Sequence, residues 1–165
     1  MDVLHKVRKA LDSITGGICV FLFSVMVIVG TYQIVTRFVF NSPSTISEEL
    51  LTYTFAWMAM FAAALVFGKR DHMRMSFLID HLSASKRKNL EIFIELLIVA
   101  FAVIVLIYGG FSIMKLTMTQ KTASLGIMMG VVYSVVPITG ILISVYGILN
   151  IIDLATDSID SKKEV

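Results

Sequence analysis

The stretch that decides the fold is Ser47–Gly68, SEELLTYTFAWMAMFAAALVFG, in which two acids precede a long apolar run. From Leu50 to Gly68 the run contains no formal charge. A helix that crosses the hydrocarbon core of a bilayer needs about 20 residues, so this run is long enough to span. Glu48 and Glu49 would then lie at the start of a membrane helix, and their purpose needs an explanation.

Three more uncharged runs occur, at Ser13–Thr36, Leu96–Met114 and Thr122–Ile152. The chain has 165 residues, of which 57% are hydrophobic, more than is usual for a soluble domain. We therefore predict an all-α polytopic membrane protein, a single domain over residues 1–165. Its four transmembrane helices are expected at about residues 13–36, 50–68, 92–114 and 124–152.

The first apolar run is too long for the apolar part of a signal peptide, which has about 7–15 residues. We expect it to remain as a membrane helix. The single cysteine, Cys19, lies inside it and is expected to be a small packing residue, because one thiol cannot form an intrachain disulfide.

Basic residues are distributed unevenly between the connections. If the helices alternate, one side carries Lys6, Arg8, Lys9, Lys69, Arg70, Arg74, Lys86, Arg87, Lys88, Lys162 and Lys163, and the other carries Arg37, Lys115 and Lys121. Basic residues concentrate on the cytoplasmic side of membrane proteins. The pattern predicts that both termini and the middle connection are cytoplasmic.

Two short amphipathic segments flank the predicted spans. One covers about residues 2–12 and the other about residues 73–83, and each combines an apolar face with basic residues. Such segments lie in the headgroup layer and are attracted to anionic lipids. We predict two interfacial helices on the cytoplasmic side.

The turn before the second span contains Asn41, Ser42, Pro43 and Ser44. Thr45 and Glu48 have the spacing of a capping box, in which a hydroxyl and an acid satisfy the first N–H groups of a helix. One acid of the pair is thus explained as a cap, and the other needs a further role.

The third span carries Glu91 and Glu95 at its start. Charged residues in membrane segments are costly and often functional. Two placements remain open for these acids: near the headgroups beside Arg87 and Lys88, or, for Glu95, in contact with a partner protein. In the fourth span, Pro137 predicts a kink.

Small residues recur four positions apart on two of the spans, a spacing that lets membrane helices approach closely. The steps are Ala59–Ala63, Gly126–Gly130 and Gly140–Ser144.

The sequence lacks the residues that several kinds of chemistry require. The three histidines, His5, His72 and His81, lie outside the spans, which argues against axial haem ligands and against a metal site. We find no nucleophile–base pair, no phosphate loop and no pattern for nucleic-acid binding, and no charge lies in the middle of a span. We predict a protein that is not an enzyme and has no cofactor.

The stretch Arg37–Met75, RFVFNSPSTISEELLTYTFAWMAMFAAALVFGKRDHMRM, resembles the small membrane subunit of tripartite ATP-independent periplasmic (TRAP) transporters. A second stretch, Ser124–Pro137, SLGIMMGVVYSVVP, resembles the start of that family's fourth helix. Three positions depart from the family pattern: Ile46, Ser76 and Met128.

The resemblance implies a location in the bacterial inner membrane and a scaffold role beside a large multi-span subunit and a periplasmic substrate-binding protein. It also implies sodium-coupled uptake of an organic anion, of the sialic acid or C4-dicarboxylate type. A stand-alone four-helix exporter is the alternative, and a membrane anchor for a respiratory enzyme is a third, which lacks its haem histidines.

Under this resemblance we expect two groups of contact residues. Those for the partner proteins are Arg37, Asn41, Glu48, Glu49, Trp57 and Glu95; those for cytoplasmic lipid headgroups are Lys69, Arg70, His72 and Arg74. We further predict that Arg37 pairs with Glu48 or Glu49 and so fixes the loop between the first two spans.

Overall fold

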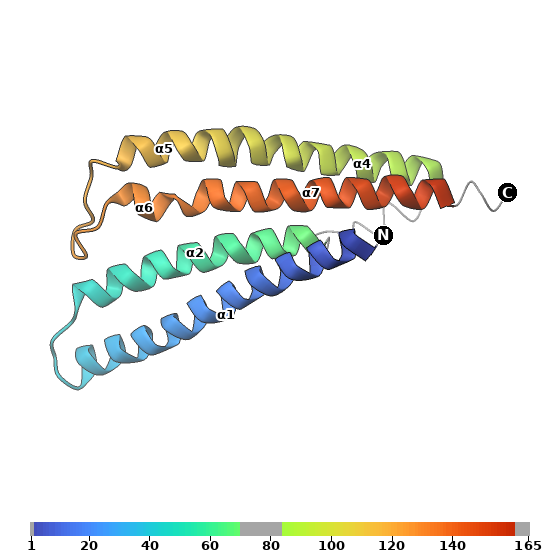
Figure 1. Cartoon of the computed structure of the whole chain (residues 1–165). Coiled ribbons are helices and arrows are strands. Elements are labelled where there is room, and N and C mark those ends of the chain that lie inside the picture. The colour runs from blue at the N-terminus through green and yellow to red at the C-terminus, as the bar shows by residue number, and fades with distance from the viewer. Residues whose placement is uncertain (1, 70–83, 161–165) are drawn as a thin grey trace.

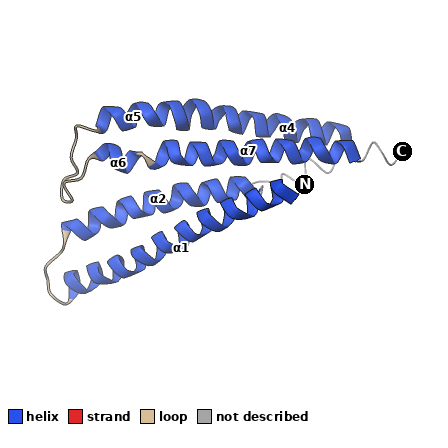
Figure 2. Cartoon of the chain, in the orientation of Figure 1, coloured by secondary structure: helices blue, strands red, loops and turns tan. Residues whose placement is uncertain are grey.

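The structure is a computed structural model that describes residues 2–69 and 84–160, with the side chains of residues 6–69 and 89–154 (Figure 1). Every regular element in these ranges is a helix (Figure 2). They are α1 (Asp2–Phe38), α2 (Thr45–Lys69), α4 (Ala84–Phe101), the π-helix η1 (Ala102–Gly109), α5 (Gly110–Thr117), α6 (Met129–Tyr133) and α7 (Val135–Asp160).

Four helical stretches are long and apolar enough to cross a membrane: Lys6–Phe38, Thr45–Lys69, Asn89–Thr117 and Met129–Leu154. The third stretch runs through α4, η1 and α5, and the fourth through α6 and α7. The predicted all-helical fold with four spans is therefore confirmed. The start of α1, the ends of α2 and α7 and the start of α4 lie at one end of the molecule, and the connections 39–44 and 118–128 lie at the other (Figure 1).

The helices lie side by side in the order α1, α2, α7, α4 (Figure 1). In the most apolar part of each span, 56% of the residues of the fourth are buried inside the chain, against 0% for the first and 11% for the third. The fourth span is therefore the central helix of the protein. The core forms where Ala64 of α2, Ala102 of η1 and Ile143 of α7 meet.

Two features of the first hairpin differ from the sequence prediction. Residues 2–12 are not a separate interfacial helix but the first turns of α1, which continues unbroken to Phe38 because no proline or turn interrupts it. The cap of α2 is Ser44 and not Thr45: the Ser44 hydroxyl accepts the backbone N–H of Ser47 at 3.4 Å. The predicted helix at residues 73–83 lies outside the described residues.

The fourth span begins later than predicted, at Met129 and not at residue 124. Gly126 has a φ of 67° and lies in the preceding connection, so the Gly126–Gly130 step does not lie on a helix. A break at Ser134 separates α6 from α7, three residues before Pro137. This is the predicted kink, because the ring of Pro137 excludes the carbonyl four residues earlier and removes one hydrogen bond.

Glycines let α7 approach the third span closely. A Cβ placed on Gly140 would lie 2.7 Å from the Cβ of Leu106 in η1, so any larger residue would force the helices apart. The same holds for Gly110 of α5, where a Cβ would lie 2.9 Å from the Cδ of Pro137. The predicted close approach at Gly140 is confirmed, whereas Ala59, on another predicted step, is exposed.

Candidate functional site: a carboxylate site and a buried polar network

At the end of the molecule that holds both short connections, the carboxylate of Glu49 accepts four hydrogen bonds. The backbone N–H groups of Ala123, Ser124 and Leu125 donate to it over 3.1, 2.7 and 2.7 Å. The hydroxyl of Tyr53, one turn further along α2, donates over 2.8 Å. We call this arrangement the Glu49 site. It joins the first turn of α2 to the connection between α5 and α6.

The connection held by the Glu49 site has its own internal hydrogen bonds. Thr122 N–H donates to the carbonyl of Ile127 at 2.8 Å, and the Thr122 hydroxyl accepts the N–H of Ile127 at 3.1 Å. Met129 N–H donates to the carbonyl of Gln120 at 2.9 Å. Backbone N–H groups are strong donors that need partners when removed from water, and a carboxylate is a strong acceptor for three of them. Glu49 therefore fixes the shape of this connection.

Glu48 and Glu49 have different roles, although they are neighbours. Glu48 is exposed in the first turn of α2, where a negative charge is favoured by the helix dipole. Glu49 is half-buried and faces the connection 118–128. The question raised by the two adjacent acids thus has two answers: one acid complements the helix end, and the other binds backbone amides.

The predicted ion pair of Arg37 with Glu48 or Glu49 is not formed. The side chain of Arg37 is exposed at the end of α1, with its guanidinium 5.9 Å from the centre of the Phe38 ring. The ion pair found among the described side chains is between Arg8 and Asp153. The prediction failed because Glu49 turns toward a connection that lies 74 to 76 residues later in the chain.

Trp57 of α2 contacts α6, the short helix before the break in the fourth span. Its indole N–H donates to the carbonyl of Val132 at 2.9 Å, and its ring packs against Phe61 with the centroids 6.3 Å apart. Trp57 is therefore engaged inside the chain. Asn41 is exposed in the connection between α1 and α2, with a φ of 47° that asparagine tolerates better than most residues.

Near the other end of the molecule, polar side chains of three helices form a network, which consists of Arg8, Glu95, Asn150 and Asp153. We call it the buried polar network because Asn150 and Glu95 are buried, while Arg8 and Asp153 at its edge are partly exposed. Asn150 is 0% exposed and lies at its centre. Its side-chain N–H donates to Glu95 at 3.1 Å, and its carbonyl oxygen accepts from Arg8 at 2.8 Å. Arg8 also donates to Asp153 at 2.7 Å.

A second contact of the same kind lies beside this network. The hydroxyl of Tyr146, a residue that is itself 0% exposed, donates to the carboxylate of Asp12 at 2.8 Å. The Tyr146 ring also packs on Gly68, where a Cβ would lie 2.6 Å from ring atoms. Three hydrogen bonds thus attach the start of α1 to α7: two from Arg8 and one to Asp12.

Glu95 is 8% exposed and lies inside the chain. Its carboxylate accepts the side-chain N–H of Asn150, and the two placements that the sequence left open, near the headgroups or against a partner protein, stay predictions. Sequence reasoning missed Arg8, Asn150 and Asp153 as a set. The available signal was Asn150, an amide within the apolar run of the fourth span, since an uncharged polar group in a membrane helix also needs a partner. Lys69 is exposed at the end of α2, whereas Arg70, His72 and Arg74 lie outside the described residues.

Comparison with known proteins identifies the family. A family model of the DctQ component of tripartite ATP-independent periplasmic transporters matches residues 26–157, which include Glu49, Glu95, Asn150 and Asp153. The chain belongs to this family. It is thus a subunit of a TRAP transporter and a multi-pass protein of the bacterial inner membrane.

Individual members of the TRAP small permease family are similar over most of the chain. A Haemophilus influenzae protein, whose provisional name is TRAP transporter small permease protein, is 28% identical over 87% of this chain and 86% of its own. The sialic acid TRAP transporter small permease protein SiaQ of Vibrio cholerae is 29% identical over 64% of this chain and 61% of its own.

A third relative differs in size. The sialic acid TRAP transporter permease protein SiaT of Haemophilus influenzae is 26% identical over 58% of this chain, and the match covers 15% of SiaT. In SiaT, a segment similar to this TRAP small subunit is therefore part of a much longer chain. The family is one of transporter components and not of enzymes.

Proposed function

We propose that this chain is the small subunit that assembles with a large membrane subunit for sodium-coupled, binding-protein-dependent uptake of an organic anion of the sialic acid type. The observation that carries the proposal is the family match over residues 26–157. Two of the similar proteins are named as components of sialic acid TRAP transporters, which supports the substrate class.

The interior of the chain supports a scaffold role rather than a transport path. No charged residue lies in the middle of a span, and polar groups near the ends form contacts within the chain, as at the Glu49 site and in the buried polar network. A path for an ion or anion through a membrane needs ionisable side chains or broken helices near the midplane. We assign the transport path to the large membrane subunit, and the capture of substrate to a periplasmic binding protein.

Reconstitution in liposomes tests this division of labour. The purified chain alone should give no uptake of sialic acid, with or without a sodium gradient, because no ionisable group lies in the middle of its spans. Liposomes that also contain the large subunit, with the binding protein outside, should accumulate labelled substrate when sodium is supplied outside. Saturable uptake by the small chain alone would contradict the proposal and favour an independent exporter.

We also propose that both termini are cytoplasmic, as the distribution of basic residues predicts. In a chain with Cys19 replaced by serine, Ser42→Cys and Lys121→Cys should react with an impermeant maleimide added to intact cells. Lys69→Cys should react only after the cells are opened, because Lys69 lies at the opposite end of α2. Labelling of Lys69→Cys in intact cells would reverse the orientation.

A further inference from the structure

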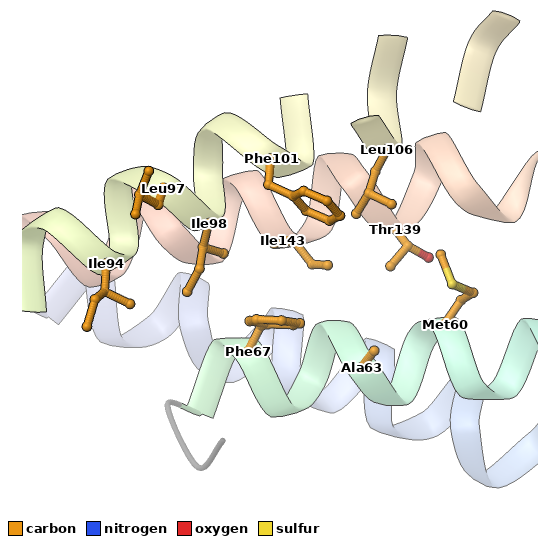
Figure 3. A pocket seen from close by; sticks show the side chains of 10 residues that line it. All are labelled: Met60, Ala63, Phe67, Ile94, Leu97, Ile98, Phe101, Leu106, Thr139 and Ile143. Carbon is orange, nitrogen blue, oxygen red and sulfur yellow. The ribbon is translucent and has the colours of Figure 1, made fainter. Parts of the chain in front are cut away.

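An apolar groove runs along one face of the protein, between α2 and the third span, with α7 as its floor (Figure 3). The volume of the groove is about 370 Å³. Its lining residues are Met60, Ala63 and Phe67 of α2, Ile94, Leu97, Ile98 and Phe101 of α4, Leu106 of η1, and Thr139 and Ile143 of α7.

The floor of the groove contains an unusual hydroxyl. Thr139 is 0% exposed, and its hydroxyl oxygen is buried without a hydrogen-bond partner among the described residues. Other hydroxyls in these helices donate to the carbonyl four residues earlier: Thr54 to Leu50, Thr117 to Ile113 and Ser144 to Gly140. Thr139 does not, although an unsatisfied hydroxyl in an apolar interior is costly.

The depth of Thr139 distinguishes between possible occupants of the groove. Thr139 lies ten residues after the start and 15 residues before the end of the fourth span, Met129–Leu154, and is therefore near the middle of that span. A lipid chain carries no hydrogen-bonding atom at that depth. A membrane helix does, through a backbone carbonyl or a Ser, Thr or Asn side chain.

A helix lying along the groove could insert only side chains into it, because 370 Å³ is much less than the volume of a three-turn helix about 10 Å across. On the third span the lining extends from Ile94 to Leu106, which is about 18 Å of helix axis, or roughly three turns. The small side chain of Ala63 allows close approach on the α2 wall. Met60, whose unbranched side chain adapts easily, lies on the same wall and can move to admit a polar group to Thr139.

We infer that this groove receives a transmembrane helix of the large subunit, and that this helix carries an acceptor for the Thr139 hydroxyl. The inference rests on the proposed function and adds the place of contact. We assign the groove to the large subunit and not to a second copy, because in SiaT a segment similar to this chain is part of a much longer polypeptide.

Site-specific photo-crosslinking tests the place of contact. The crosslinking amino acid p-benzoyl-phenylalanine is placed at Leu97 or Phe101 in the groove, which are 54% and 56% exposed, in a chain co-expressed with its large subunit. Val20 and Ile28 of α1, 68% and 69% exposed, are the controls. Light should join the groove positions, and not the α1 positions, to the large subunit.

Each other outcome has a definite meaning. Crosslinks to the large subunit from α1 alone would overturn the groove assignment but keep the proposed function. Groove crosslinks only to lipid, or only to a second copy of this chain, would also overturn the assignment. If the parent chain does not co-purify with the large subunit at all, the proposed function fails, and the inference fails with it.

Substitution of Thr139 tests the polar contact. Thr139→Val removes the hydroxyl at nearly constant shape, so it should weaken the complex about 3- to 20-fold, as expected for one hydrogen bond between membrane helices. It should not lower the thermal stability of the isolated chain, where the hydroxyl has no partner. Thr139→Ser, which keeps the hydroxyl, should keep the affinity. Equal affinity of the valine variant and the parent would overturn the contact.

Discussion

Glu49→Gln should release the connection 118–128, whereas Glu48→Gln on the neighbouring residue should leave it unchanged. The glutamine side chain keeps one acceptor oxygen, but its amide group would face N–H groups that now donate to a carboxylate. Hydrogen bonds to a charged acceptor are stronger than those between neutral groups, so the Glu49→Gln variant should hold the connection less tightly. The exposed Glu48 should contribute less than about 0.5 kcal/mol.

Amide hydrogen exchange measures this effect directly. In the Glu49→Gln variant, protection of the amides of Ala123, Ser124 and Leu125 should fall about 2- to 10-fold each, as expected for the weakening of one hydrogen bond. Glu48→Gln is the matched control, since it makes the same chemical change one residue away. If the two variants show the same exchange in residues 123–125, the Glu49 site does not hold this connection.

Asn150→Leu should destabilise the whole chain by about 3–5 kcal/mol. Asn150 is fully buried and bonds to two ionisable side chains, Glu95 and Arg8, so its replacement removes a partner from each. Unfolding in detergent can be followed by fluorescence, because Trp57 is the single tryptophan and its indole N–H is bonded to Val132 of the fourth span. Ser24→Ala, on an exposed part of α1, is the control and should change little.

A double-mutant cycle separates this network from simple loss of packing. Glu95→Leu combined with Asn150→Leu removes the buried carboxylate together with its amide partner, so the double variant should be less destabilised than the sum of the two single variants. Additive losses would show that Asn150 and Glu95 contribute independently and that the network is not a unit.

The all-helical fold with four helices able to span a membrane followed from the sequence. Apolar runs of about 20 residues predict spans because backbone groups in lipid must be hydrogen-bonded within the segment. The predicted run from residue 50 to 68 lies within the α2 helix of Thr45–Lys69. Errors occurred at the ends, where α1 continues through residues 2–12 and the fourth span begins at Met129 instead of residue 124.

The contacts between helices were harder to predict from the sequence. Glu48 and Glu49 have almost the same local sequence, yet only Glu49 reaches the backbone of residues 123–125. Arg8 has the appearance of a solvated cation beside a membrane helix, but it contacts Asn150 and Asp153, more than 140 residues away. Local patterns do not distinguish these cases, because each depends on which face of a helix is turned toward its neighbour.

The sequence by itself determined that this chain is a four-span helical membrane protein, and its motifs indicated the TRAP family. Tertiary structure decided which polar residues meet, and it brought Thr139 to the floor of the apolar groove. The physical reason is that a span requires only a local balance between apolar side chains and satisfied backbone groups. The rotation of each helix, by contrast, is set by packing between distant segments, such as Gly140 against Leu106 and Gly68 against Tyr146.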